Sequence, residues 1–214
     1  MASEKKLPEH VQIIHSLMLR SKKNREVLIP TVLLTGIVSL FLGVSITLKA
    51  GIGSEFNAEA ITTGSWVSSW LLAAVSVLLL TVFFAGKQAK RENHPVNTPQ
   101  LRHVFRSIAP ALVLGFASGT ALCFHDFSYL PVTASLWIAC YGVALHAIRL
   151  YTTKSARFLG IVMLAIGLSG LFVSLKTQGM IHPLHLANYF MALSFGMFHL
   201  VVASGSILFA KATR

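Results

Sequence analysis

Charged side chains are scarce in this sequence. Asp, Glu, Lys and Arg make up 12% of its 214 residues, while 54% of the residues are hydrophobic. In a soluble globular domain about a quarter of the residues are charged. So little charge excludes a soluble domain of this size, and the composition predicts a protein embedded in a lipid bilayer.

Acidic residues are especially few, with seven Asp and Glu in the whole chain. None of them lies in the interior of a long apolar run. Carriers that couple transport to protons or sodium commonly relay the ion through a carboxylate within the membrane. The sequence therefore argues against such a carrier, and it leaves a channel, a carbonyl-lined site or a passive carrier open.

Cysteines and the common catalytic motifs are also few or absent. The two cysteines, Cys123 and Cys140, differ by about 10 Å in predicted membrane depth at about 1.5 Å per helical residue, so we expect small buried residues and no disulfide. The sequence has no Gly-rich phosphate loop after a strand, no nucleophilic serine motif and no spaced set of zinc ligands. These absences give no support to an enzyme, and that question stays open.

Six apolar runs are long enough to cross the hydrocarbon core of a bilayer, which takes about 17–25 helical residues. They lack the alternation of polar and apolar residues that strands of a membrane barrel show. We therefore predict an all-α polytopic membrane protein, a bundle of six transmembrane helices. The predicted spans are 27–48, 65–85, 107–124, 131–151, 158–175 and 184–210.

The basic residues are distributed unevenly around these spans. Sixteen of the eighteen lysines and arginines precede the first span, lie at the second and fourth connections, or follow the last span, and Lys49 and Lys176 are the exceptions. Since short basic connections stay in the cytoplasm, both termini are predicted to be cytoplasmic. Topology thus explains the net charge of +11, and nucleic acid is not an expected partner.

The first 26 residues form a basic segment ahead of the transmembrane domain at 27–214. Pro8 suits the first turn of a helix, and Val11, Ile14 and Met18 follow at helical spacing. This pattern predicts an amphipathic cytoplasmic helix that binds anionic lipid headgroups. The alternative is a basic flank that only sets the topology.

Small residues recur within several spans and predict close helix contacts, notably at Gly115 and Gly119. The stretch LWIACYGVALHAIRLYTTKSARFLGIVMLAIGLSGL has a Tyr-Gly pair in one span, a short basic turn and a Leu-Gly pair opening the next. In these features it resembles small uncharacterised six-helix bacterial inner-membrane proteins. The resemblance implies a similar architecture in a bacterial inner (plasma) membrane, and it carries no activity with it.

Two histidines in apolar spans are candidate cofactor ligands. His146 and His199 each lie fifteen residues into a span that runs from outside to inside, so their rings are predicted to lie at a similar depth. Gly142 and Gly196 precede them by about one turn and leave room for a flat macrocycle, and Arg149 can pair with a propionate. The pattern predicts a b-type haem in a non-catalytic electron-transfer subunit.

The alternative is that these histidines are structural. A membrane histidine can hydrogen-bond a neighbouring hydroxyl or carbonyl and so fix how helices pack. The protein is then a cofactor-free scaffold, sensor or regulatory protein, and a passive channel or carrier for a small solute is a third hypothesis. Beyond the lipid bilayer, a membrane protein partner or a homo-oligomer stays open.

A second cluster of polar residues lies at the outer ends of the third and sixth spans. His125 and Asp126 occur in CFHDF, and His182 and His185 occur in HPLH. Imidazole and carboxylate groups suit zinc or copper, so we predict a metal site here. The alternative is that these side chains cap helix ends.

Overall fold

A computed structural model shows an all-helical chain. It describes residues 9–51, 61–91, 99–149, 152–177 and 179–212, although the side chains of 9–28, 85, 88–89, 99–101 and 209–212 are outside the description. Within these residues six helices are long and apolar enough to cross a membrane. The predicted all-α architecture with six spans is thus confirmed, and insertion and orientation stay predictions.

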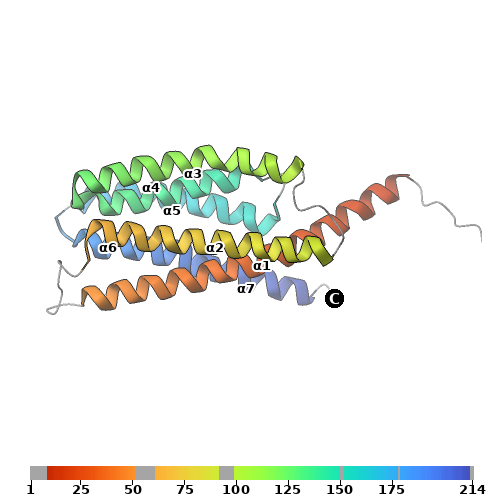
Figure 1. Ribbon diagram of the computed structural model, residues 1–214, viewed down its shortest axis with the longest axis horizontal. Coiled ribbons are helices and arrows are strands. Elements are labelled where there is room, and N and C mark those ends of the chain that lie inside the picture. Colours follow the sequence, from red (N-terminus) through yellow and green to blue (C-terminus); the bar gives the residue numbers. More distant parts are fainter. Residues whose placement is uncertain (1–8, 52–60, 92–98, 150–151, 178, 213–214) are drawn as a thin grey trace, which may run out of the picture.

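The elements follow one another as antiparallel helices (Figure 1). A short 3-10 helix, η3, leads into α4, and a π-helical segment, η4, lies between α6 and α7. The elements are α1 (Glu9–Ala50), α2 (Thr63–Arg91), α3 (Pro99–His125), η3 (Phe127–Tyr129), α4 (Leu130–Ala147), α5 (Lys154–Lys176), α6 (Pro183–Met191), η4 (Ala192–Phe198) and α7 (His199–Ala212). The apolar spans are Ile29–Ala50, Thr63–Phe84, Arg102–His125, Phe127–Ala147, Lys154–Lys176 and Pro183–Leu208.

Helix α1 crosses the predicted boundary at residue 26 without a break. It is 42 residues long, and among the described side chains its apolar span is Ile29–Ala50. In Figure 1 its N-terminal part extends past the end of the other helices. The structure thus has one helix from Glu9 that continues into the first span. The amphipathic face and the contact with anionic headgroups predicted for residues 1–26 depend on side chains outside the described residues.

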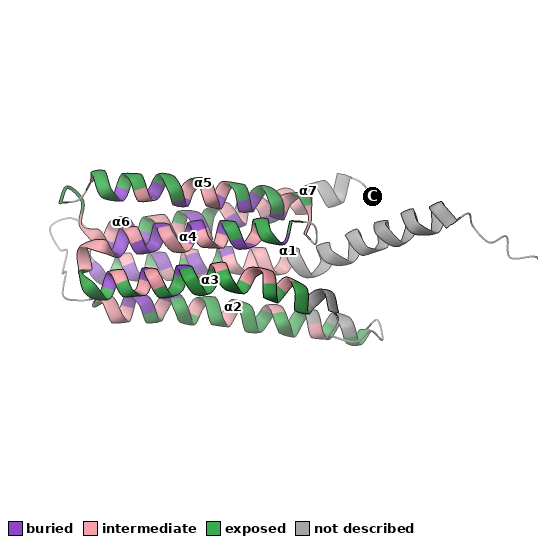
Figure 2. Cartoon of the chain, turned by 90° about the horizontal axis from the view of Figure 1, so that it is seen from above, coloured by how far each residue is buried: buried purple, intermediate pink, exposed green. Residues whose placement is uncertain are grey.

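Helix α4 is at the centre of the bundle. It packs against α3, α5 and α6, and its span contains the largest share of buried residues among the six. Helix α1 packs against α2 on one side and against α6, η4 and α7 on the other. Figure 2 shows the buried residues on the sides where helices face one another and the exposed residues turned outward, toward the predicted lipid.

Glycines make the closest contacts between helices. A β-carbon at Gly142 would lie 2.5 Å from the backbone nitrogen of Leu164, so α4 and α5 touch through their backbones. Such contacts replace the hydrophobic driving force that helices lack in lipid, and they confirm the predicted close approach. The glycines at which a β-carbon would lie 3.0 Å or less from an atom of a neighbouring helix are Gly36, Gly43, Gly115, Gly119, Gly142, Gly160, Gly167, Gly170 and Gly196.

Candidate functional site

The sixth span changes its helical geometry near its middle. The seven residues of η4, Ala192–Phe198, form a π-helix, in which each N–H bonds to the carbonyl five residues back instead of four. Side chains that follow such a segment are turned relative to an uninterrupted α-helix. π-Helical segments are rare and frequently occur at functional sites, and His199 follows this one directly.

His199 is completely buried, and both of its ring nitrogens have partners. Nδ1 lies 3.1 Å from the carbonyl oxygen of Ser194, and Nε2 lies 3.2 Å from the hydroxyl oxygen of Tyr141. Because a carbonyl only accepts, we assign the proton to Nδ1, which donates to Ser194. Nε2 then accepts from the Tyr141 hydroxyl, so this hydrogen bond joins α4 to the sixth span.

Aromatic contacts hold the imidazole in place. The ring of Phe195 stacks on the His199 ring with centroids 5.7 Å apart, and Tyr141 meets Phe195 edge to face at 5.1 Å. Both geometries are favourable for aromatic pairs. The three rings therefore form one packed cluster around the hydrogen-bonded histidine.

Asn188 makes the corresponding link to α1. Its Nδ2 donates to the carbonyl oxygen of Gly43 at 2.7 Å and to the hydroxyl of Thr47 at 2.8 Å. Its Oδ1, like the Oγ of Ser194, is buried without a hydrogen-bond partner among the described residues. Buried polar atoms without a hydrogen-bond partner are rare in proteins. Here they occur beside polar groups that do form hydrogen bonds.

A strip of residues C-terminal to Asn188 in the sixth span packs directly on α1. Its residues recur every four positions. In each of their contacts with α1 one of the two residues is a glycine, so the two backbones approach closely. His199 lies off this strip and turns toward α4. The paired residues are Ala192 with Gly43, Gly196 with Leu40, and Leu200 with Gly36.

The predicted haem residues do not come together as a cofactor site. His146 is exposed in the last turn of α4, and its Nε2 lies 2.6 Å from the guanidinium of Arg149. The faces of Gly142 and Gly196 are filled by α5 and α1, and both nitrogens of His199 are hydrogen-bonded. As placed, these residues do not fit a haem between them, and the haem stays a prediction without support from their arrangement.

Two of the predicted metal ligands, Asp126 and His182, cap helices at the end of the bundle opposite to His146. Oδ1 of Asp126 accepts the backbone N–H of Ser128 at 2.7 Å, and Nδ1 of His182 accepts that of Leu184 at 3.3 Å. The hydrogen bonds from Ser128 lower the pKa of Asp126. Burial, followed by the nearby charge of His185, lowers the pKa of His182. The capping alternative is confirmed for these two residues.

The short helix η3, which follows the third span, meets the start of the sixth span. The ring of Phe127 lies 5.7 Å from that of His182, which lies 6.0 Å from that of His185, both measured between centroids. Among the described residues, however, no three His, Cys, Asp or Glu side chains are grouped so that they could hold a metal ion. The metal site predicted from His125, Asp126, His182 and His185 therefore gains no support.

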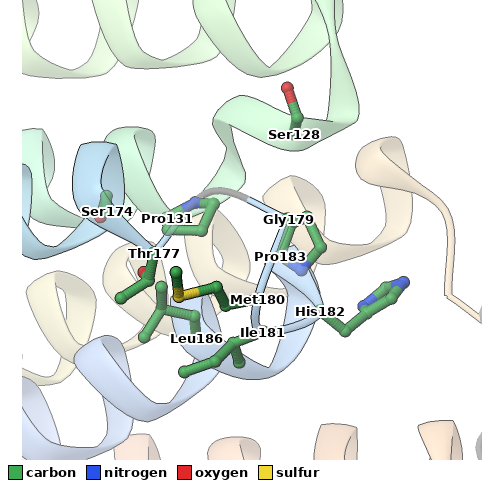
Figure 3. A pocket seen from close by; sticks show the side chains of 10 residues that line it. All are labelled: Ser128, Pro131, Ser174, Thr177, Gly179, Met180, Ile181, His182, Pro183 and Leu186. Carbon is green, nitrogen blue, oxygen red and sulfur yellow. The ribbon is translucent and has the colours of Figure 1, made fainter.

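A pocket of about 480 Å³ opens at this end, where α5 ends and α4 and α6 begin (Figure 3). Its wall is mostly apolar, and none of its lining residues carries a full charge except His182 when protonated. The hydroxyls of Ser174 and Thr177 already donate to carbonyls of α5. In Figure 3 the His182 ring points away from Met180 and Leu186. The pocket therefore lacks the convergent polar groups that define a specific site.

Comparison with known proteins identifies no relative. No family model matches the sequence, and neither a curated protein nor a solved structure matches it significantly. The resemblance to small bacterial inner-membrane proteins stays a prediction. The buried contact of the π-helical segment with α1 and α4 is thus the feature from which a function has to be inferred.

Proposed function

We propose that this protein is a cofactor-free membrane sensor or regulatory protein in which the sixth span acts on α1. The observation that carries the proposal is the continuity of α1, which runs as one helix from its contact with η4 to Glu9. The residues of α1 that precede the predicted span at 27–48 extend the helix beyond that span. A displacement of α1 at η4 is therefore passed along a continuous helix to its basic N-terminal part.

The π-helical segment is suited to two alternative states. Converting η4 to an α-helix would turn the following residues by about 100°, the rotation that one residue makes in an α-helix. His199 would then leave Tyr141, and the strip that packs on α1 would be displaced. Packed interfaces of this kind switch between discrete arrangements instead of deforming gradually, which is how small local changes become larger movements.

We further propose that the moving end of α1 lies in the cytoplasm of a bacterial cell. The end of the bundle where α1 enters is also where α2 ends, α3 begins and the chain ends (Figure 1). By sequence, sixteen of the eighteen lysines and arginines precede the first span, lie in the connections from α2 to α3 and from α4 to α5, or follow the last span. The positive-inside rule then favours both termini in the cytoplasm. The inner-membrane location rests on the resemblance to small bacterial inner-membrane proteins.

Removal of one residue from η4 tests the proposal. Leu193 is 43% exposed, so its deletion shortens the π-helical turn to α-helical length without removing a buried side chain. Spin labels at positions 22 and 155, in full-length protein with both native cysteines replaced and reconstituted in nanodiscs, report the distance from α1 to the start of α5. We expect the deletion to shift the distance distribution by several ångströms.

The matched control is Leu193→Ala, which keeps the number of residues in η4 and should leave the distances unchanged. A second variant, His199→Gln, tests the same coupling without altering chain length and should broaden or shift the distribution. Identical distributions in wild type, the deletion and His199→Gln, each purified as a monodisperse protein of unchanged helicity, would contradict the proposal.

A further inference from the structure

A small hollow lies on α2 where this helix leaves the predicted hydrocarbon core. The apolar span of α2 ends at Phe84, and the helix continues to Arg91. At this transition a hollow of about 280 Å³ is formed by Val82, Phe83, Gly86, Lys87 and Lys90. The hollow therefore contains both apolar side chains of the span and basic side chains beyond it.

The two lysines of the hollow share one face of the helix. Lys87 and Lys90 are three residues apart, so their side chains are neighbours on the helix surface. Both are exposed, and neither forms an ion pair with a residue that the structure describes. Two ammonium groups side by side favour a ligand that carries negative charge.

The rest of the hollow is suited to an apolar chain. Val82 and Phe83 are exposed on the side of the lysines nearer the predicted membrane centre, at 49% and 62%. Gly86 has no side chain to fill the hollow, and a β-carbon there would meet nothing within 4 Å. An anionic group joined to a hydrocarbon chain thus matches the hollow in charge, in polarity and in membrane depth.

We propose that this hollow binds the phosphate of an anionic phospholipid between Lys87 and Lys90, with an acyl chain along Val82 and Phe83. The site goes beyond the proposed sensor function and does not depend on it. It also differs from the lipid contact predicted for residues 1–26, because it lies on α2. Phosphate is the group that the lysines would bind, and the apolar wall is what would distinguish a lipid from free phosphate.

Titration of the delipidated full-length protein with phosphatidylglycerol, followed by native mass spectrometry, tests the site. We expect wild type to bind phosphatidylglycerol in preference to phosphatidylcholine with the same acyl chains. Lys87→Gln with Lys90→Gln should weaken this binding about thirtyfold, which corresponds to roughly 1 kcal/mol per basic residue at an anionic surface. Gly86→Leu should weaken it as well, since it fills the hollow and keeps both charges.

The control variant carries Lys154→Gln and Arg157→Gln, two exposed basic residues at the same end of the bundle. It removes the same charge and should bind phosphatidylglycerol like wild type. An equal loss in this control would mean general charge attraction and would overturn the proposal. So would unchanged binding by the Gly86→Leu variant, or displacement of the lipid by millimolar inorganic phosphate.

Discussion

Single residues explain why the apolar interior of this bundle contains an imidazole and an amide. A polar group without a partner costs several kcal/mol in hydrocarbon. His199 and Asn188 avoid most of this cost because each finds a partner on another helix, Tyr141 in α4 and Thr47 in α1. Their hydrogen bonds link the sixth span to both of its main neighbours.

Tyr141→Phe should destabilise the protein by about 0.6–1.7 kcal/mol, which is between the average and the largest value measured for hydrogen bonds between membrane helices. The substitution keeps the ring that packs on Phe195 and removes the hydroxyl that donates to His199. Reversible unfolding in mixed micelles provides the measurement. Tyr189→Phe, on a ring that is 56% exposed, is the matched control and should have no effect. Equal stabilities of the two variants would show that the Tyr141 bond contributes nothing.

Asn188→Asp should destabilise the protein more than Asn188→Leu. Leucine loses two hydrogen bonds and also removes the unpartnered Oδ1, so we expect a cost of about 1 kcal/mol. Aspartate places a carboxylate against the carbonyl oxygen of Gly43, which cannot donate, and leaves the Thr47 hydroxyl as its donor, so the variant should cost more than about 3 kcal/mol. The same unfolding measurement ranks the variants. An aspartate variant as stable as wild type would contradict the donor role of Asn188.

The haem hypothesis also has a direct test at this scale. Because His199 uses both ring nitrogens and His146 bonds to Arg149, protein expressed with an adequate haem supply should purify without a Soret band. Absorption spectroscopy of the gently purified protein checks this expectation. A Soret band that disappears in both His146→Ala and His199→Ala would instead support axial ligation by these residues.

At the scale of helices, η4 explains why α-helical spacing failed to predict the surroundings of His199. Regular spacing places His199 on the same face as Gly196 and Asn188. The π-helical turn separates them, so Gly196 and Asn188 face α1 while His199 bonds to Tyr141 on α4. Tyr141 and Ser194 were accordingly missing from the predicted site. His199, a histidine within an apolar span, was the sequence signal that pointed toward this region.

Helix contacts through glycine give a prediction at the same scale. Gly142→Ala adds a methyl group that would lie 2.5 Å from the backbone nitrogen of Leu164 and 2.8 Å from the carbonyl oxygen of Gly160. Backbone atoms cannot yield as a side chain does, so α4 and α5 should separate at a cost of about 1–3 kcal/mol. Thermal unfolding monitored by circular dichroism measures the change.

The control is Gly64→Ala, because a β-carbon at Gly64 would meet nothing within 4 Å. This variant should be unchanged or slightly more stable, since alanine favours helix over glycine. If the alanine at position 142 were tolerated as well as the one at position 64, the close contact between α4 and α5 would be contradicted.

At the scale of the whole molecule, the six spans bring the basic ends of the helices to one side of the bundle. Helices α2 and α4 end there, and α3 and α5 begin there, each with lysine or arginine close by. Lys49 and Lys176 lie at the ends of α1 and α5 on the other side. This asymmetry is the basis for the proposed cytoplasmic location of both termini.

Reporter fusions test that orientation. A reporter that is active only in the cytoplasm should be active after Arg214 and inactive when inserted near Glu55, and a periplasmic reporter should give the opposite result. The expectation follows from the sixteen basic residues that would otherwise have to be translocated. A periplasmic signal after Arg214 would overturn the orientation and, with it, the cytoplasmic output proposed for α1.

The sequence by itself determined the helical class, the number and approximate ends of the spans, and the glycines that allow close packing. These properties depend on the length and polarity of local segments, which the bilayer selects directly. Only the tertiary structure decided that α5 and α1 fill the space beside Gly142 and Gly196, that His199 pairs with Tyr141, and that His182 caps α6. Each of these depends on where a neighbouring helix lies and how it is rotated, and a single π-helical turn changes that rotation for every residue after it.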